Sequence, residues 1–145
     1  MLVCLLLASA TSYSLGFSLM EKEIVVVNAD KQKCREICEL LQGWDYSGTQ
    51  LHTLSNLEEH IQKSACQVVI MDIDTVPIDN RAIRQLTLKN PGVYFLCLSE
   101  DRFHPELKEA LCYHIYACIK KPVDPDELFY WLKSIDKNGA WSDDV

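Results

Sequence analysis

The chain has 145 residues, a length typical of one domain that can bury a core without disulfides or a metal. Hydrophobic residues make up 48% of it and charged residues 24%, a composition that excludes a disordered chain. The net charge of −7 disfavours a domain that binds nucleic acid, because such domains usually carry a basic patch.

The first twenty residues contain no charged side chain, and three interpretations of residues 1–19 stay open. A secretory signal would explain the apolar run and the small residues Ala8-Ser9-Ala10, but signals begin with a basic region that is lacking here. A membrane anchor needs about 20 mainly apolar residues, and several serines dilute this stretch. The third interpretation is an extension, or a misassigned start, ahead of a domain that begins at Met20.

The seven cysteines do not form a pattern typical of a metal or redox motif, since no Cys-x-x-Cys occurs. A disulfide framework would suit a smaller secreted chain. Isolated cysteines within apolar runs, such as Cys97, behave as small buried hydrophobic residues. We therefore expect free thiols in a reducing, cytoplasmic compartment.

The first half of the domain alternates between strand and helix patterns. The β-branched run 24–27 predicts a strand buried on both faces. Apolar residues at i, i+3, i+4 and i+7 predict an amphipathic helix over 34–41, with Gly43 as its stop. Residues 50–54 form a weak strand pattern, and a capping box of Ser55-x-x-Glu58 predicts a short helix to about residue 63.

The same alternation continues through the middle of the chain. Residues 68–71 predict a second fully apolar strand, which ends at Asp72. A helix is expected over 79–89, followed by an Asn-Pro-Gly turn. Residues 93–98 then predict a third apolar strand, which ends at Ser99.

The last two units complete the pattern. We expect a helix over 105–113, a short strand over 117–119, and a final helix that Asp124 caps and Pro125 opens. Five strands that alternate with helices predict an α/β fold: a doubly wound parallel sheet with right-handed crossovers. Five units fit the flavodoxin-like strand order 2-1-3-4-5.

Polar residues follow the predicted strands at the edge where such sheets bind ligands. The first strand is followed by Asn28-Ala29-Asp30, and the third by Asp72-Ile73-Asp74. The fourth ends in Ser99-Glu100 and the fifth in Lys121-Pro122. No glycine-rich loop follows the first strand, which argues against a dinucleotide or P-loop nucleotide site.

Several motifs occur together in a known order and spacing. They are Val-Ile-Met-Asp72 with Pro77 and Asp79 behind it, Leu98-Ser99, and Ile119-Lys120-Lys121-Pro122 before an acidic helix start. Together they resemble the response-regulator receiver domain of two-component signalling, over about residues 23–137. The resemblance implies a single-domain regulator in a phosphorelay.

The resemblance assigns roles to the polar residues at the strand ends. Asp72 matches the aspartate that accepts a phosphoryl group from a histidine kinase or phosphotransfer protein. Lys121 would pair with the phosphoryl oxygens, and Ser99 would donate a hydrogen bond to one of them. The implied Mg²⁺ site, which needs hard oxygen ligands, consists of Asp30, Asn28, Asp72 and the backbone carbonyl of Asp74.

The chain departs from the receiver pattern at three places. Receivers usually have two adjacent acidic residues after the first strand, whereas this chain has Asn28-Ala29, with Asp30 one position later. Asp30 could reach the metal or only cap the first helix. Glu100 replaces a small residue, and Cys118 stands at the position of the family's switch aromatic. These departures support an alternative, a pseudo-receiver that binds a protein partner without phosphotransfer.

The expected organisation is an extension over 1–19, a receiver domain over 20–138 and a short polar tail over 139–145. We expect no DNA-binding output domain and no membrane segment within the receiver domain. The protein should therefore act through protein contacts: an upstream kinase or phosphotransfer protein, a downstream partner, and a possible homodimer through the face of the last helix. The sequence does not identify these partners.

Overall fold

The computed structural model describes residues 23–101 and 114–137. The uncharged extension, the helix expected over 105–113 and the C-terminal tail lie outside the described residues. Within the described part, no helix is both long enough and apolar enough to cross a bilayer.

The predicted sheet is confirmed. All strand pairs are parallel, and the order is β2-β1-β3-β4-β5, the flavodoxin-like arrangement expected from the sequence. The strands are β1 (Glu23–Val27), β2 (Ser47–Leu51), β3 (Val68–Asp72), β4 (Tyr94–Ser99) and β5 (Ala117–Lys120).

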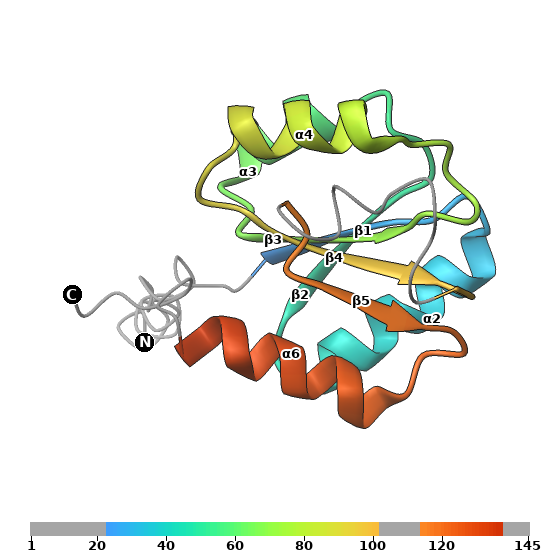
Figure 1. The fold of residues 1–145 in the computed structure, drawn as a ribbon. Helices are drawn as coiled ribbons and strands as arrows, with labels where there is room; N and C mark the ends of the chain where they lie inside the picture. Colours follow the sequence, from blue (N-terminus) through green and yellow to red (C-terminus); the bar gives the residue numbers. More distant parts are fainter. Residues whose placement is uncertain (1–22, 102–113, 138–145) are drawn as a thin grey trace, which may run out of the picture.

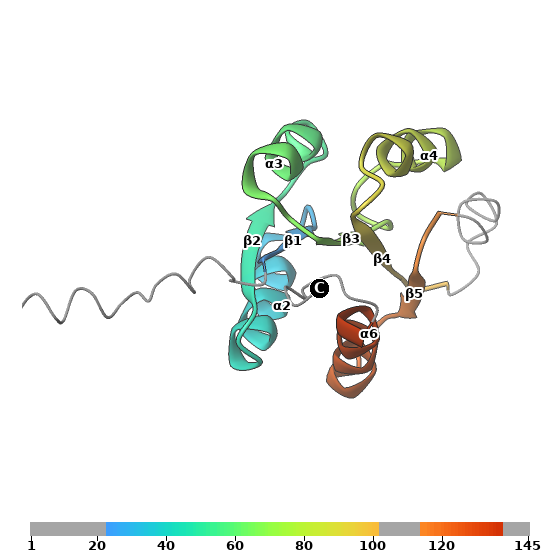
Figure 2. The same cartoon turned by 90° about the vertical axis from the view of Figure 1, so that its left-hand side faces the viewer.

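Helices cover both faces of this sheet, as a doubly wound fold requires. The described helices are α2 (Lys31–Gly43), α3 (Leu57–Ser64), α4 (Asn80–Lys89) and α6 (Pro125–Lys137). Helices α3 and α4 lie on one face, and α2 and α6 lie on the other (Figures 1 and 2). The strand ends that follow β1, β3, β4 and β5 therefore open at one edge between these two layers (Figure 1).

The central strands are apolar throughout because they bury side chains on both faces. Alternate residues of β1 and β3 enter two separate core clusters, one beneath α3 and α4 and one beneath α2 and α6. The five described cysteines are all free, and Cys34, Cys66 and Cys97 are buried, as expected for small hydrophobic side chains. Burial raises the pKa of the Cys66 thiol to about 11.

Two predicted boundaries were wrong. The weak strand lies at 47–51 rather than 50–54, because its position is set by pairing with β1, where Val25 is opposite Thr49, and not by its own polar sequence. Helix α3 begins at Leu57 with Asn56 as its N-cap, and no side chain caps it. The predicted Ser55 cap is therefore absent. Glu58 in the first turn instead places a favourable charge at the positive end of the helix and lies 3.5 Å from Lys89 Nζ of α4.

Helix α2 ends at the predicted stop. Gly43 is the last helical residue, Trp44 is the C-cap, and the left-handed conformation falls on Asp45, with φ of 69°. A second glycine has the more demanding position. A Cβ atom at Gly48 would lie 3.0 Å from the Cys38 sulfur and 3.3 Å from Leu41 Cδ1, so β2 approaches α2 closely only with glycine there.

We predict opposite effects of alanine at these two glycines. Gly48→Ala should lower the free energy of unfolding by about 1–3 kcal/mol, because the added methyl group forces α2 away from the sheet. Gly43→Ala meets nothing within 4 Å and should raise that free energy by about 0.5–1 kcal/mol. Urea unfolding monitored by circular dichroism measures both, and an equal effect of the two substitutions would contradict the packing argument.

Candidate functional site

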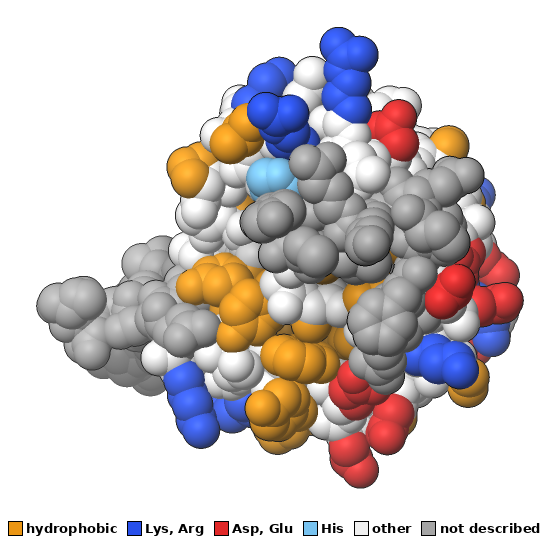
Figure 3. Space-filling view, viewed as in Figure 1, with side chains coloured by type: hydrophobic (Ala, Val, Ile, Leu, Met, Phe, Trp, Pro, Cys, Tyr) orange, Lys and Arg blue, Asp and Glu red, His pale blue; other side chains and the backbone are white. Residues whose placement is uncertain are grey.

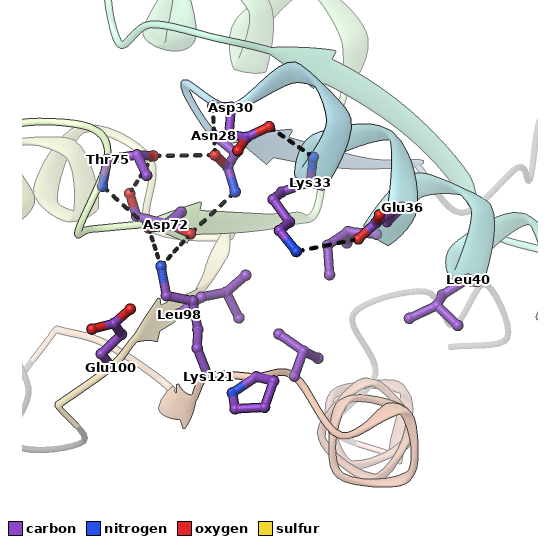
Figure 4. Close-up of a pocket in the computed structure, with 13 residues that line it drawn as sticks. Asn28, Asp30, Lys33, Glu36, Leu40, Asp72, Thr75, Leu98, Glu100 and Lys121 are labelled. Atoms are coloured by element: carbon purple, nitrogen blue, oxygen red, sulfur yellow. Dashed lines mark hydrogen bonds and ion pairs between the residues drawn. The ribbon is translucent and has the colours of Figure 1, made fainter.

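Four strand ends bring the predicted polar residues together at one edge of the sheet. Asn28 follows β1, Asp72 ends β3, Ser99 ends β4, and Lys121 follows β5. Asn28, Asp72 and Lys121 line a cavity of about 650 Å³ that extends along α2 towards the segment before α6 (Figure 4). The edge thus combines a charged end with an apolar groove.

The Asp72 carboxylate is almost completely buried, with 3% of the residue exposed, and both its oxygens are hydrogen-bonded. Lys121 Nζ lies 2.8 Å from Oδ2 and 3.1 Å from Oδ1. Asn28 Nδ2 donates to Oδ2 at 3.1 Å, and the backbone amides of Asp74 and Thr75 donate to Oδ1 at 3.0 and 3.2 Å. This donor set stabilises a buried anionic carboxylate.

Lys121 connects two carboxylates. Besides its bonds to Asp72, its Nζ lies 3.1 Å from Asp74 Oδ2. Burial alone would lower the pKa of Lys121, but the hydrogen bonds and charges of the two aspartates raise it above the usual value. The backbone amide of Lys121 donates to the Ser99 carbonyl at 2.9 Å, which fixes the base of the side chain to the end of β4.

Asn28 is held with its amide nitrogen towards Asp72. Its Oδ1 accepts the Asp30 backbone amide at 2.8 Å and the Thr75 hydroxyl at 3.2 Å, while Thr75 Oγ1 in turn accepts the Ala29 amide at 3.1 Å. Thr75 is a site residue that the sequence analysis missed, because a single hydroxyl three residues after a strand end is no motif.

Asp30 caps α2. One of its carboxylate oxygens accepts the amides of Gln32 and Lys33 at 3.0 and 3.1 Å. Of its two possible roles, the structure therefore shows the cap. Within the described residues, no group of three or more His, Cys, Asp or Glu side chains is placed to hold a metal ion. The oxygens of Asp72, Asn28 and the Asp74 carbonyl still match Mg²⁺ in chemical kind.

Asp74 has a side-chain role that the sequence analysis did not assign. Its Oδ1 accepts the Ser99 hydroxyl at 3.2 Å, and its Oδ2 accepts the Glu100 backbone amide at 2.8 Å. Partial burial would raise the pKa of Asp74, but the Glu100 amide, Lys121 and the Ser99 hydroxyl together hold it below its usual value. Ser99 is fully buried, whereas the Glu100 side chain is exposed.

Cys118, which stands at the position of the switch aromatic, and the nearby Tyr116 lie on opposite sides of the sheet. Cys118 is half-buried against the core cluster beneath α3 and α4. The nearby Tyr116 lies in the other layer, where its hydroxyl is 2.7 Å from Ser134 Oγ of α6 and its ring packs edge-on against Trp131. Tyr116 thus connects the start of β5 to the last helix.

No family model and no curated protein matches the sequence. Solved structures do match. The signal receiver domain of an HD domain-containing protein from Pseudomonas fluorescens Pf-5 is 17% identical, with a TM-score of 0.72 over 81% of this chain and 96% of that one. A CheY-like receiver domain from Methanospirillum hungatei JF-1 is 18% identical, with a TM-score of 0.72 over 82% and 99%. The chain has the receiver fold.

The beryllofluoride-activated NtrC4 receiver domain dimer is a further match, with 16% identity and a TM-score of 0.72 over 83% of this chain and 99% of that one. Identities this low establish the fold alone. Within the receiver fold, Asp72 ends the central strand β3, and Lys121 reaches it from the end of β5.

We predict measurable coupling between Asp72 and Lys121. Lys121→Met should lower the free energy of unfolding by about 2 kcal/mol, because it leaves a buried carboxylate without its cation. In the double variant with Asp72→Asn, the loss should be smaller than the sum of the single losses by about 1 kcal/mol. Chemical denaturation at neutral pH tests this, and strict additivity would mean that the pair contributes nothing.

Proposed function

We propose that this chain is a response-regulator receiver that accepts a phosphoryl group on Asp72 from a histidine kinase or phosphotransfer protein. The observation that carries the proposal is the buried Asp72 carboxylate at the end of the central strand, bonded to Lys121 and facing a cavity. The receiver fold supports it, since that fold places its ligands at this edge.

The transfer itself needs mainly positioning and charge stabilisation. An Asp72 oxygen attacks phosphorus, the P–N bond of the phosphohistidine breaks, and its electron pair returns to the imidazole of the donor protein. Lys121, already 2.8 Å from Asp72 Oδ2, neutralises charge on the group that arrives. The amides of Asp74 and Thr75 hold the other oxygen and so fix the carboxylate during attack.

Mg²⁺ belongs to the same proposal. Asp72 and the Asp74 carbonyl would hold it. Asn28 could contribute its oxygen only after releasing the Asp30 amide and the Thr75 hydroxyl, and Asp30 only the oxygen that does not cap α2. When bound, the ion neutralises negative charge on the phosphoryl oxygens. The set has fewer carboxylates than a receiver with two adjacent acids, because Ala29 contributes no ligand, so we expect weak binding.

The test is incubation of the full chain with acetyl phosphate and Mg²⁺, followed by intact mass spectrometry. The wild-type chain should gain one phosphoryl group, because Asp72 has the geometry of an acceptor, and Asp72→Ala should gain none. Equal labelling of the two proteins, or no labelling of the wild-type chain, would defeat the proposal.

A second variant isolates the metal contribution. Ala29 is exposed beside the site, so Ala29→Asp adds a carboxylate without disturbing the core. It should raise Mg²⁺ affinity and the labelling rate by about tenfold. Unchanged labelling at Mg²⁺ concentrations below saturation would argue against this edge as the metal site.

The alternative function is that of a pseudo-receiver, which binds its partner without phosphotransfer. The specific observation in its favour is that Asp30 caps α2 while both Asp72 oxygens already have donors from the protein. It predicts that neither the wild-type chain nor Ala29→Asp is labelled and that Asp72→Asn leaves partner binding unchanged.

We assign the output surface to the outer face of α6. Phe129 and Tyr130 are exposed there, at 37% and 62%, and hydrophobic side chains gather over this side of the molecule (Figure 3). The first turn of α6 is acidic and its last turn contains Lys137. Two antiparallel copies would therefore place opposite charges together around the aromatic residues, and a downstream protein could use the same face.

Self-association tests this surface in the pure protein. In sedimentation velocity with beryllofluoride and Mg²⁺, the wild-type chain should form a dimer, and Tyr130→Ser should stay monomeric because it removes the exposed ring. Leu88→Ser, which removes a comparably exposed side chain from α4 on the other layer, is the matched control. The same dimer in both variants would place the interface elsewhere.

A further inference from the structure

Three donors from two segments, the end of β4 and the residue after β5, converge on the Asp74 side chain. The Ser99 hydroxyl of β4 donates to Oδ1 at 3.2 Å, and the Glu100 amide and Lys121 Nζ reach Oδ2 at 2.8 and 3.1 Å. Two of them, Ser99 and Lys121, are the groups that the receiver resemblance assigns to the phosphoryl oxygens. The donors are therefore already occupied by an anion that belongs to the chain.

A carboxylate can satisfy these donors in the way a phosphoryl group would. Both present anionic oxygens to an ammonium group, a hydroxyl and a backbone amide, which form short, charge-assisted hydrogen bonds. Lys121 lies between Asp72 and Asp74, so the Asp74 carboxylate adjoins the acceptor across the same cation. The Ser99 hydroxyl and the Glu100 amide each have one hydrogen to donate, so a phosphoryl group on Asp72 cannot take them while Asp74 holds them, and it must share Lys121 with Asp74.

Resting on the proposed function, we propose that the Asp74 carboxylate is an internal substitute for the phosphoryl group. It competes with a phosphoryl group for the same donors, and it keeps Ser99 turned inward in the unmodified chain. Asp74 is thus a positioning residue that acts through Ser99, Glu100 and Lys121, and it sets the state of the edge before any modification.

Asp74 is more exposed than Asp72, as expected of a side chain that can leave its donors when a phosphoryl group arrives. The Asp72 side chain is 3% exposed, whereas that of Asp74 is 26% exposed and lies in the segment after β3. Asp74 can therefore move into solvent without unpacking the core. The exposed Glu100 carboxylate carries the same charge at the same edge, which makes Glu100 the matched control.

Ser99 connects the position of the Asp74 carboxylate to the backbone that follows β4. While its hydroxyl donates to Asp74, the same oxygen accepts the Asp101 backbone amide at 3.0 Å. When Asp74 leaves, Ser99 loses the partner that orients it. A change at Asp74 should therefore alter the backbone at residues 99–101 even when no phosphate is present.

The first arm of the test uses the full chain without phosphodonor. In proton–nitrogen NMR spectra, the amide of residue 100 should shift upfield and exchange faster in Asp74→Ala, because it loses a charged acceptor. In Glu100→Ala the shift of the residue 100 amide changes with its own side chain, but its protection from exchange should stay at the wild-type level, because the Asp74 acceptor remains. An unchanged amide in Asp74→Ala would overturn the proposal.

The second arm measures labelling by acetyl phosphate with Mg²⁺. Asp74→Ala retains the backbone carbonyl, so the implied metal ligand is preserved, and its labelling rate should exceed that of the wild-type chain about tenfold. Glu100→Ala should change the rate by far less. An equal acceleration in both variants would reduce the effect to net charge and overturn the competition.

The two arms separate the two proposals. If no variant is labelled but the residue 100 amide loses its protection from exchange in Asp74→Ala alone, the phosphoacceptor function fails and Asp74 still holds the donors. If the wild-type chain is labelled as fast as Asp74→Ala and the amide does not move, the function stands and the role of Asp74 fails. Asp74→Asn, which keeps an acceptor oxygen but no charge, should give intermediate results in both arms.

Discussion

The Asp72–Lys121 ion pair is the interaction on which the carboxyl edge of this sheet depends. A carboxylate with 3% exposure needs a cation and a full set of donors, and the chain supplies them from the ends of β1 and β5 and from the turn after β3. Removing the cation would leave a buried negative charge without a counterion. The fold therefore places this ion pair at the carboxyl edge of the sheet, between the two helical layers.

The same pair links local packing to the chemistry proposed for the site. The backbone bond from Lys121 to Ser99 joins the ends of β4 and β5, so the lysine reaches Asp72 from a fixed base. The Asp74 carboxylate contacts the same ammonium group, and it also accepts hydrogen bonds from the Ser99 hydroxyl and the Glu100 amide. One ammonium group thereby links Asp72 to Asp74, and Asp74 links it to the donors at the end of β4. Whether those donors are occupied therefore depends on what is bound at Asp72.

Much of this arrangement could be predicted from the sequence because strands buried on both faces have continuous apolar runs. The ends of the runs at Asp72 and Ser99 located the edge, and Asp79 and Pro125 marked helix starts that the structure confirms. The boundaries of β2 could not be predicted, since its polar residues carry no period and pairing with β1 decides them. The side chain of Asp74 was missed because the receiver resemblance implies a role for its backbone carbonyl, and no sequence pattern shows the direction in which its carboxylate turns.

Strand β2 has a consequence for how other proteins can meet this molecule. Among the described strands it is the outermost on its side, and its sequence Ser-Gly-Thr-Gln-Leu is short and polar. An edge of this kind is a poor template for strand addition, because it offers few backbone groups and little apolar surface to a second strand. On that side of the sheet, helix α2 offers the better surface for recognition. Its close contact with Gly48, where an added Cβ would lie 3.0 Å from the Cys38 sulfur, sets how near the helix stands to the strand.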